Sequence, residues 1–211
     1  MLKPYLIAVN NVEDESIVNR SRFICYLTPC TSSEAAKLFV KSIIEIHPQA
    51  THHCYAFVTG AAADSQGYGF SDDGEPSGTA GRPMLAALQG NDVGEICAVV
   101  VRYFGGTKLG TGGLQRAYGG SVRQAFAFLQ SKIKIAMVHK TLACQYNQVN
   151  DVLHIIELAQ GQVLEQSFLQ QVEFVFALPQ EKLTWVQEKL QTLSAGFLVL
   201  KSLDNEQDTK I

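Results

Sequence analysis

The chain has 211 residues, 46% of them hydrophobic, with 17 basic and 20 acidic side chains and a net charge of −3. This composition suits one or two globular domains and excludes a protein-wide basic field, so any anion-binding role must rest on local clusters of cations. No apolar run approaches the ~20 residues of a membrane helix, and no long apolar segment of secretory type opens the chain. We therefore expect a cytoplasmic protein with no membrane association.

The first part of the chain alternates predicted strands and helices. Period-2 patterns and apolar runs predict strands at residues 2–9, 16–28, 51–59 and 95–104, with a short strand at 68–71. Helical spacing predicts helices at about 32–46, 80–90 and 113–130. Thr31 and Glu34 have the spacing of a capping box before the first helix, and Ser77 or Thr79 is placed to cap the second.

The last part of the chain predicts a βαββαβ order. Strands are expected at 140–145, 162–169, 172–178 and 197–203, with helices at about 149–159, opened by Asn147, and 183–193. This order is typical of the ferredoxin-like sandwich. We place the boundary near residues 132–138, which gives an N-terminal domain at 1–134 and a C-terminal domain at 135–211, both of the α+β class.

One stretch, residues 71–123, carries most of the unusual residue chemistry. It runs from SDDGEPSGTAGRP through the apolar ICAVVVRYF to GGTKLGTGGLQRAYGGSVR, and all but two of the 17 glycines lie between Gly60 and Gly120. Backbone N–H groups of such loops, together with nearby cations, can bind an anion or a sugar-phosphate backbone. The candidate contacts are Arg82, Arg102, Lys108, Gly110, Gly112, Gly113, Arg116 and Arg123. Alternatively, the glycines serve tight turns and close helix packing.

A second candidate site lies on the strand at 51–59 and the acidic loop. Its members are His52, His53, Cys54, Asp72, Asp73 and Glu75. His52 and Cys54 share one face of the strand, which would suit a thiol nucleophile with a histidine base. Alternatively, Cys54 is a small core residue and the DDGE loop caps a helix. The five cysteines form no C-x-x-C pair, which favours reduced thiols, and we expect no metal ion and no cofactor.

Four segments resemble the IMPACT family. They are SRFI at 21–24, ATHHCYAF at 50–57, SDDGEPSGTAGRP at 71–83 and VVVRYFGGTKLGTGGLQRAY at 99–118. The resemblance implies a first domain similar to the second domain of a small-subunit ribosomal protein, a βαβ fold also found in elongation factor G. It further implies a link to translation, since eukaryotic members regulate that process.

Three functional hypotheses remain open from the sequence. The first is a non-enzymatic, translation-associated regulator that binds RNA, a ribosome or a translation factor through the Gly-rich basic surface. The second is an enzyme with a small-molecule pocket at the second candidate site and the Gly-rich loops. The third is a protein-interaction module that acts through the C-terminal sheet.

Overall fold

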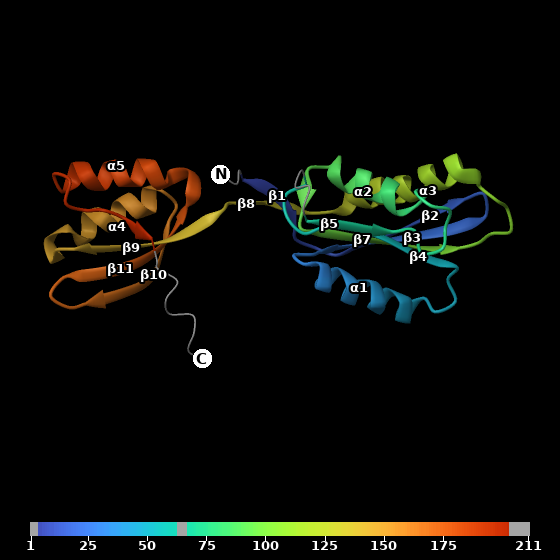
Figure 1. The fold of residues 1–211 in the computed structure, drawn as a ribbon, viewed down its shortest axis with the longest axis horizontal. Coiled ribbons are helices and arrows are strands. Elements are labelled where there is room, and N and C mark those ends of the chain that lie inside the picture. The colour runs from blue at the N-terminus through green and yellow to red at the C-terminus, as the bar shows by residue number, and fades with distance from the viewer. Residues whose placement is uncertain (1–3, 63–66, 203–211) are drawn as a thin grey trace. The chain divides into compact units, whose positions relative to one another are not determined.

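The computed structural model describes residues 4–62 and 67–202. The chain divides into two compact units, with the boundary between Lys134 and Ile135 (Figure 1). Both units combine helices with mainly antiparallel sheets, so the α+β class expected from the sequence is confirmed. Among the described residues no helix is both long and apolar enough to span a membrane.

A five-stranded sheet forms the centre of the first unit. Its strand order is β2 (Val12–Val18), β3 (Ser21–Pro29), β7 (Ile96–Tyr103), β4 (His52–Val58) and β5 (Tyr68–Ser71), and every neighbouring pair is antiparallel. The central strand β7 is buried along residues 96–101. Such a continuous apolar strand is expected where both faces of a sheet are covered.

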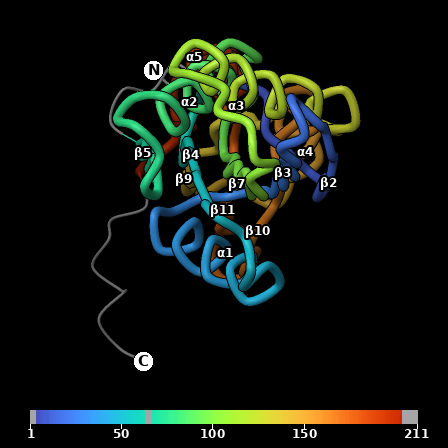
Figure 2. Tube along the Cα trace, turned by 90° about the vertical axis from the view of Figure 1, so that its right-hand side faces the viewer, coloured from blue at the N-terminus to red at the C-terminus, as the bar shows by residue number. Residues whose placement is uncertain are grey.

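Helices cover both faces of this sheet. The helix α1 (Ser33–Ile46) packs on one face, and α2 (Gly81–Gln89) and α3 (Gly110–Ala125) pack on the other (Figure 2). A short 3₁₀ turn, η1 (Phe126–Phe128), continues α3. A small sheet completes the unit, in which β1 (Tyr5–Ala8) pairs in parallel with β6 (Val93–Gly94) and antiparallel with β8 (Ser131–Lys134).

Several element boundaries of the first unit differ from the sequence prediction, and the short strands β6 and β8 were not predicted. The strand expected at 16–28 is a hairpin, whose turn residues Asn19 and Arg20 have φ values of 47° and 67°. Such turns usually contain glycine. Because neither residue is a glycine, the sequence did not predict the hairpin. Ser32 rather than Thr31 caps α1, because its Oγ accepts a bond of 3.1 Å from the backbone N–H of Ala35. The third helix begins at Gly110, three residues earlier than expected.

The second unit has the expected βαββαβ order. Its elements are β9 (Met137–Cys144), α4 (Val149–Leu158), β10 (Gln162–Phe168), β11 (Val172–Pro179), α5 (Leu183–Leu193) and β12 (Lys201–Ser202). The sheet order β10-β11-β9-β12, with all neighbours antiparallel, is that of a ferredoxin-like sandwich. Short 3₁₀ turns, η2 (Tyr146–Gln148) and η3 (Gln180–Lys182), precede the two helices, and Gln145 rather than Asn147 supplies the cap before α4.

Among the described residues, helices cover only one face of this second sheet. Buried residues of β9 and β11, among them Leu142 and Phe174, pack against α4 and α5. The strand predicted at 197–203 is much shorter where the structure describes it, because only Lys201 and Ser202 pair with β9. Residues 197–200 run beside α5 instead. Residue 203 lies outside the described range.

Candidate functional site

The two Gly-rich loops meet at one end of the five-stranded sheet, over a buried charged cluster. The alternation of β7 places Arg102 on the α3 side, two residues beyond Val100. Its Nη1 donates a bond of 2.5 Å to Oε1 of Glu75 in the first loop, and the hydroxyl of Tyr118 on α3 donates a bond of 2.8 Å to the same oxygen. We call Glu75, Arg102 and Tyr118 the Glu75 cluster. Its members are 8%, 5% and 0% exposed, so the three groups depend on one another for hydrogen bonds.

The surroundings of Arg102 are largely apolar. The guanidinium carbon lies 5.5 Å from the ring centroids of both Phe23 and Phe104, and Nη2 reaches the Ser21 hydroxyl at 3.4 Å. The Ser21 hydroxyl also accepts from the N–H of Gly105, where the second loop begins. Arg102 was expected among the cations that contact phosphate. Its burial and its carboxylate partner correct that expectation, because they give it the role of joining the two loops.

The side chain of Asp72 caps the N-terminus of α2. Its carboxylate accepts from the N–H groups of Gly78, Ala80 and Gly81 at 2.8, 3.0 and 2.8 Å. Burial pushes the pKa of Asp72 upward, but these three donors outweigh it and hold the pKa below its ordinary value. The helix was expected to be capped by a residue at 77 or 79. A carboxylate from an earlier turn does so instead, and it leaves these N–H groups unavailable to an external anion.

The acidic loop is tied to β4 by its second aspartate. The Asp73 carboxylate accepts from the His53 N–H at 2.6 Å, and the Asp73 carbonyl oxygen lies 2.7 Å from Nδ1 of His52. The His52 ring then approaches the Glu75 cluster, with Nε2 3.8 Å from Glu75 Oε1. His53 points to the other face of the sheet, where its Nε2 lies 3.1 Å from the carbonyl oxygen of His47. The structure therefore separates the two histidines that sequence reasoning had placed in one pocket.

Cys54 does not have the surroundings of a nucleophile. The side chain is fully buried, its thiol donates to the carbonyl oxygen of Asp72 at 3.0 Å, and burial raises the pKa of Cys54 to about 12. A thiol in this state is almost entirely protonated at neutral pH. Among residues 4–62 and 67–202, no group of three or more His, Cys, Asp or Glu side chains could hold a metal ion.

The four remaining cations of the candidate surface are exposed. They are Arg82, Lys108, Arg116 and Arg123. Within the described chain, none of them has an ion-pair or hydrogen-bond partner. We call this set the cation rim. Its cations lie on or beside the N-terminal parts of α2 and α3 and along α3, and Lys108 precedes α3 by two residues.

Close packing of α2 and α3 brings part of this rim together. A Cβ at Gly119 would lie 3.3 Å from the carbonyl oxygen of Pro83 and 3.1 Å from Nη1 of Arg123. Only glycine at this position allows that approach without a shift of α2. The guanidinium of Arg123 therefore lies beside the first turn of α2, which also carries Arg82.

The N-terminus of α3 contrasts with that of α2. Its N-cap residue, Leu109, makes no side-chain hydrogen bond to the helix. Gly106 and Gly110 have φ values of 83° and 69°, and a Cβ at either one would meet nothing within 4 Å. Gly110 and Gly112 are exposed and Gly113 is half-buried, since a Cβ at Gly113 would lie 3.1 Å from Cβ of Leu109. The first N–H groups of α3 carry the positive end of the helix dipole.

Sequence reasoning missed two members of the buried network. Neither Tyr118, on the predicted third helix, nor Ser21 was among the candidate site residues. Two signals were nevertheless present. A buried tyrosine hydroxyl needs a hydrogen-bond partner, and an arginine two residues beyond a buried valine needs a carboxylate close by.

Fold and loops together define a class of two-domain α+β proteins, in which two Gly-rich loops close over a buried Arg–Glu pair. The model of the Impact N-terminal domain matches residues 19–126, and a domain of unknown function (DUF1949) matches residues 142–196. The chain belongs to the IMPACT family.

Relatives match along nearly the whole length. An IMPACT family member of Haemophilus influenzae is 44% identical over 200 residues, covering 95% of this chain and 97% of the relative. The IMPACT family member YigZ of Escherichia coli is 44% identical over 203 residues, with coverage of 96% and 100%. A crystal structure described as that of a hypothetical protein superposes with a TM-score of 0.69 at 43% identity, covering 98% of this chain and all of that one.

Proposed function

We propose that this protein is a translation-associated regulator that binds RNA, including ribosomal RNA, through the cation rim and the open N-terminus of α3. The observation that carries the proposal is the contrast among the cations of the site. Arg102 is buried and neutralised by Glu75, whereas the four rim cations are exposed and unpaired within the described chain. Unpaired cations beside a free helix N-terminus are suited to phosphate oxygens.

The surface fits a phosphate backbone better than a mononucleotide. The rim extends from Lys108 to Arg123 along the length of α3, which spans several phosphate groups rather than one. Phe104, 48% exposed at the end of β7, offers a ring face on which an unpaired base can stack. Tyr103 is engaged on the α1 side, where its hydroxyl lies 2.9 Å from Nδ1 of His47.

Three further observations agree with this proposal. All five cysteines are free thiols, as expected for a protein that works in the reducing cytoplasm. The enzyme alternative loses two of its groups, because Cys54 is a protonated, buried thiol and His53 faces away from His52. Family membership supports the link to translation that the sequence motifs imply.

Charge removal from the rim tests the proposal. We expect the triple variant Lys108/Arg116/Arg123→Ala to stay folded, because its changes are at exposed positions. Its affinity for single-stranded RNA and for purified ribosomes should fall strongly. The slope of log affinity against log salt should flatten by about 2 units. The variant makes fewer phosphate contacts, so its binding releases fewer counterions from the RNA.

A matched control removes the same charge elsewhere. The variant Lys37/Lys41/Lys132→Ala changes three exposed lysines, two on α1 across the sheet and one on β8, and should keep the wild-type salt slope. Equal slopes for wild type and the rim variant would overturn the proposal. A rim variant that loses RNA but still binds ribosomes would instead indicate that ribosome binding uses another surface of the protein.

A further inference from the structure

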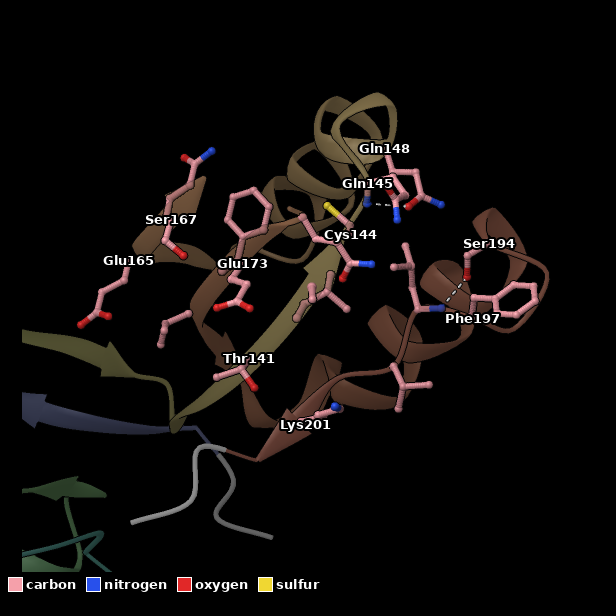
Figure 3. A pocket seen from close by; sticks show the side chains of 18 residues that line it. Thr141, Cys144, Gln145, Gln148, Glu165, Ser167, Glu173, Ser194, Phe197 and Lys201 are labelled. Atoms are coloured by element: carbon pink, nitrogen blue, oxygen red, sulfur yellow. Dashed lines mark hydrogen bonds between the residues drawn. The ribbon is translucent and has the colours of Figure 1, made fainter. Parts of the chain in front are cut away.

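The second unit contains a groove of about 970 Å³ on the open side of its sheet (Figure 3). One wall consists of β9, β10 and β11, and the other is the segment after α5. Ala143, Glu173, Ser194, Phe197, Val199 and Lys201 are among its lining residues. Figure 3 shows Ser167 and Glu173 on the side of the sheet and Ser194 and Phe197 across from them.

The groove exists because residues 142–144 of β9 lack a strand partner on one edge within the described chain. β12 pairs with β9 only at Lys201–Thr141 and Ser202–Lys140. Residues 142–144 pair with β11 on one side, and the described chain supplies no strand on the other. An unpaired strand edge is a template for another extended chain.

Helix α5 holds the neighbouring segment away from β9. The hydroxyl of Ser194 accepts from the Leu198 N–H at 2.8 Å, and Oε1 of Gln187 accepts from the Leu200 N–H at 2.8 Å. Nε2 of Gln187 donates back to the Leu198 carbonyl oxygen at 3.1 Å. The N–H groups of Leu198 and Leu200 are thus satisfied by Ser194, which follows α5, and by Gln187 on α5, so the gap beside β9 leaves neither group without a partner.

Side chains along the edge specify what kind of strand would fit. Ser167, Glu173 and Ala143 form one cross-strand row on the open face, and the row ends at the unpaired edge. A residue opposite Ala143 meets only a methyl group, so a long basic side chain can pass over it to the Glu173 carboxylate. Glu165 adds a second negative charge on the same face. Residues on either side would point the other way, toward Leu142 and Cys144, which are buried and apolar.

Exposed apolar side chains border the same groove. Phe197 is 88% exposed and Val199 is 47% exposed. Exposed apolar groups that adjoin an open strand edge are typical of surfaces that bind another chain. The acidic side chains disfavour RNA here, so this surface is separate in kind from the cation rim.

We infer that the edge of β9 at residues 142–144 accepts an extended segment of a partner protein as an added β-strand, with an apolar–basic–apolar pattern whose basic residue pairs with Glu173. The added strand takes its main-chain bonds from the free edge of β9 and its specificity from the row that ends at Ala143. This inference is independent of RNA binding by the first unit.

Synthetic peptides test the pattern with the full chain. A fluorescent peptide with a Val-Lys-Val core should bind, and one with a Val-Glu-Val core should bind about tenfold more weakly or worse, as measured by anisotropy. The variant Glu173→Lys should reverse this preference. N-methylation of alternate peptide amides should abolish binding, because it removes main-chain donors. Hydrogen exchange should show at least one amide of residues 142–144 becoming protected by the peptide.

Glu188→Lys is the matched control, an equal charge change at an exposed position on α5 outside the groove lining, and it should leave the preference unchanged. The inference is overturned if neither peptide binds at about millimolar concentration, near the weak end of specific affinities. It is also overturned if Glu173→Lys leaves the lysine-over-glutamate preference intact, or if N-methylation has no effect.

Discussion

The two central sheets of this protein are both antiparallel, yet they are covered differently. The five-stranded sheet has α2 and α3 on one face and α1 on the other, and its strand β7 is buried from residue 96 to 101. Among the described residues, α4 and α5 cover one face of the four-stranded sheet, and the exposed residues Ala143 and Glu173 alternate with buried residues in β9 and β11. A continuous apolar run therefore indicates a strand that is covered on both faces, and alternation of apolar and polar residues indicates a strand that is covered on one face.

This difference decides where each unit can present a binding surface. In the first unit no sheet face is free, so special chemistry gathers in the loops and helix ends at one end of the sheet. That arrangement buries the positive charge of Arg102, and the Glu75 carboxylate, which also accepts from Tyr118, neutralises it. The second unit leaves a sheet face and part of a strand edge exposed, and its interior contains no comparable ion pair among the described residues.

The largest expected effect would come from breaking the buried pair of the first unit. Glu75→Ala leaves the Arg102 guanidinium and the Tyr118 hydroxyl without their shared acceptor, so we expect the free energy of unfolding to fall by about 3–5 kcal/mol. Calorimetry on the full chain should show the transition of the first unit at lower temperature. The single tryptophan, Trp185, lies on α5, and the unfolding midpoint that its fluorescence reports should stay unchanged.

The double variant Glu75→Leu/Arg102→Met sharpens this test. Removing both charges together should cost far less than Glu75→Ala alone, because no buried charge is left without a partner. If Glu75→Ala cost less than about 1 kcal/mol, the range typical of a surface ion pair, the pair would not be the buried tie between the loops that the geometry indicates.

An intermediate effect is expected at the cap of α2. Asp72→Ala removes the acceptor of three backbone N–H groups, and a lost helix cap costs about 1–2 kcal/mol. The folded protein holds the pKa of Asp72 below its ordinary value of 3.8. The stabilisation that the Asp72 carboxylate supplies is therefore fully present above the ordinary pKa of 3.8. It is lost as the pH falls through the lower pKa of the folded state. The stability difference between wild type and variant, measured by urea unfolding, should shrink as the solution is acidified.

Asp72→Asn is the control for charge at this cap. The amide keeps one acceptor oxygen but places an NH₂ group beside a backbone donor, so its cost should fall between those of wild type and Asp72→Ala. Both variants lack the carboxylate, so the two stability differences from wild type should shrink in parallel as the pH falls through the folded pKa of Asp72. A difference from wild type that did not shrink in acid for either variant would contradict the assignment of this pH dependence to the Asp72 carboxylate.

Most helices and strands could be predicted from the sequence because periodicity is a local property. What the sequence missed depends on contacts between distant segments or on unusual backbone geometry. The hairpin at Asn19 and Arg20 has positive φ values without a glycine. Asp72 caps a helix that begins nine residues later. Arg102 was placed among exposed cations because a strand pattern gives the direction of a side chain but does not identify the loop that covers it.

The smallest expected effect on stability is at the edge of the second sheet. Phe197→Ser replaces a phenylalanine that is 88% exposed, and we expect the free energy of unfolding to change by less than about 0.5 kcal/mol. Phe174→Ser in the same unit is the matched comparison. That ring is 1% exposed and stacks on Phe176 with centroids 5.0 Å apart, so its loss should cost at least about 3 kcal/mol. Trp185 fluorescence during urea unfolding reports both.

A small cost at Phe197 would show that this apolar side chain does not contribute to folding of the domain. Its exposure would then be available for binding another chain, as the inference for the groove requires, because a partner can cover the ring without any rearrangement of the core. A cost at Phe197 close to that at Phe174 would mean that residues 197–200 close over the core in solution. The open edge of β9, and with it the contrast between the two sheets, would then be lost.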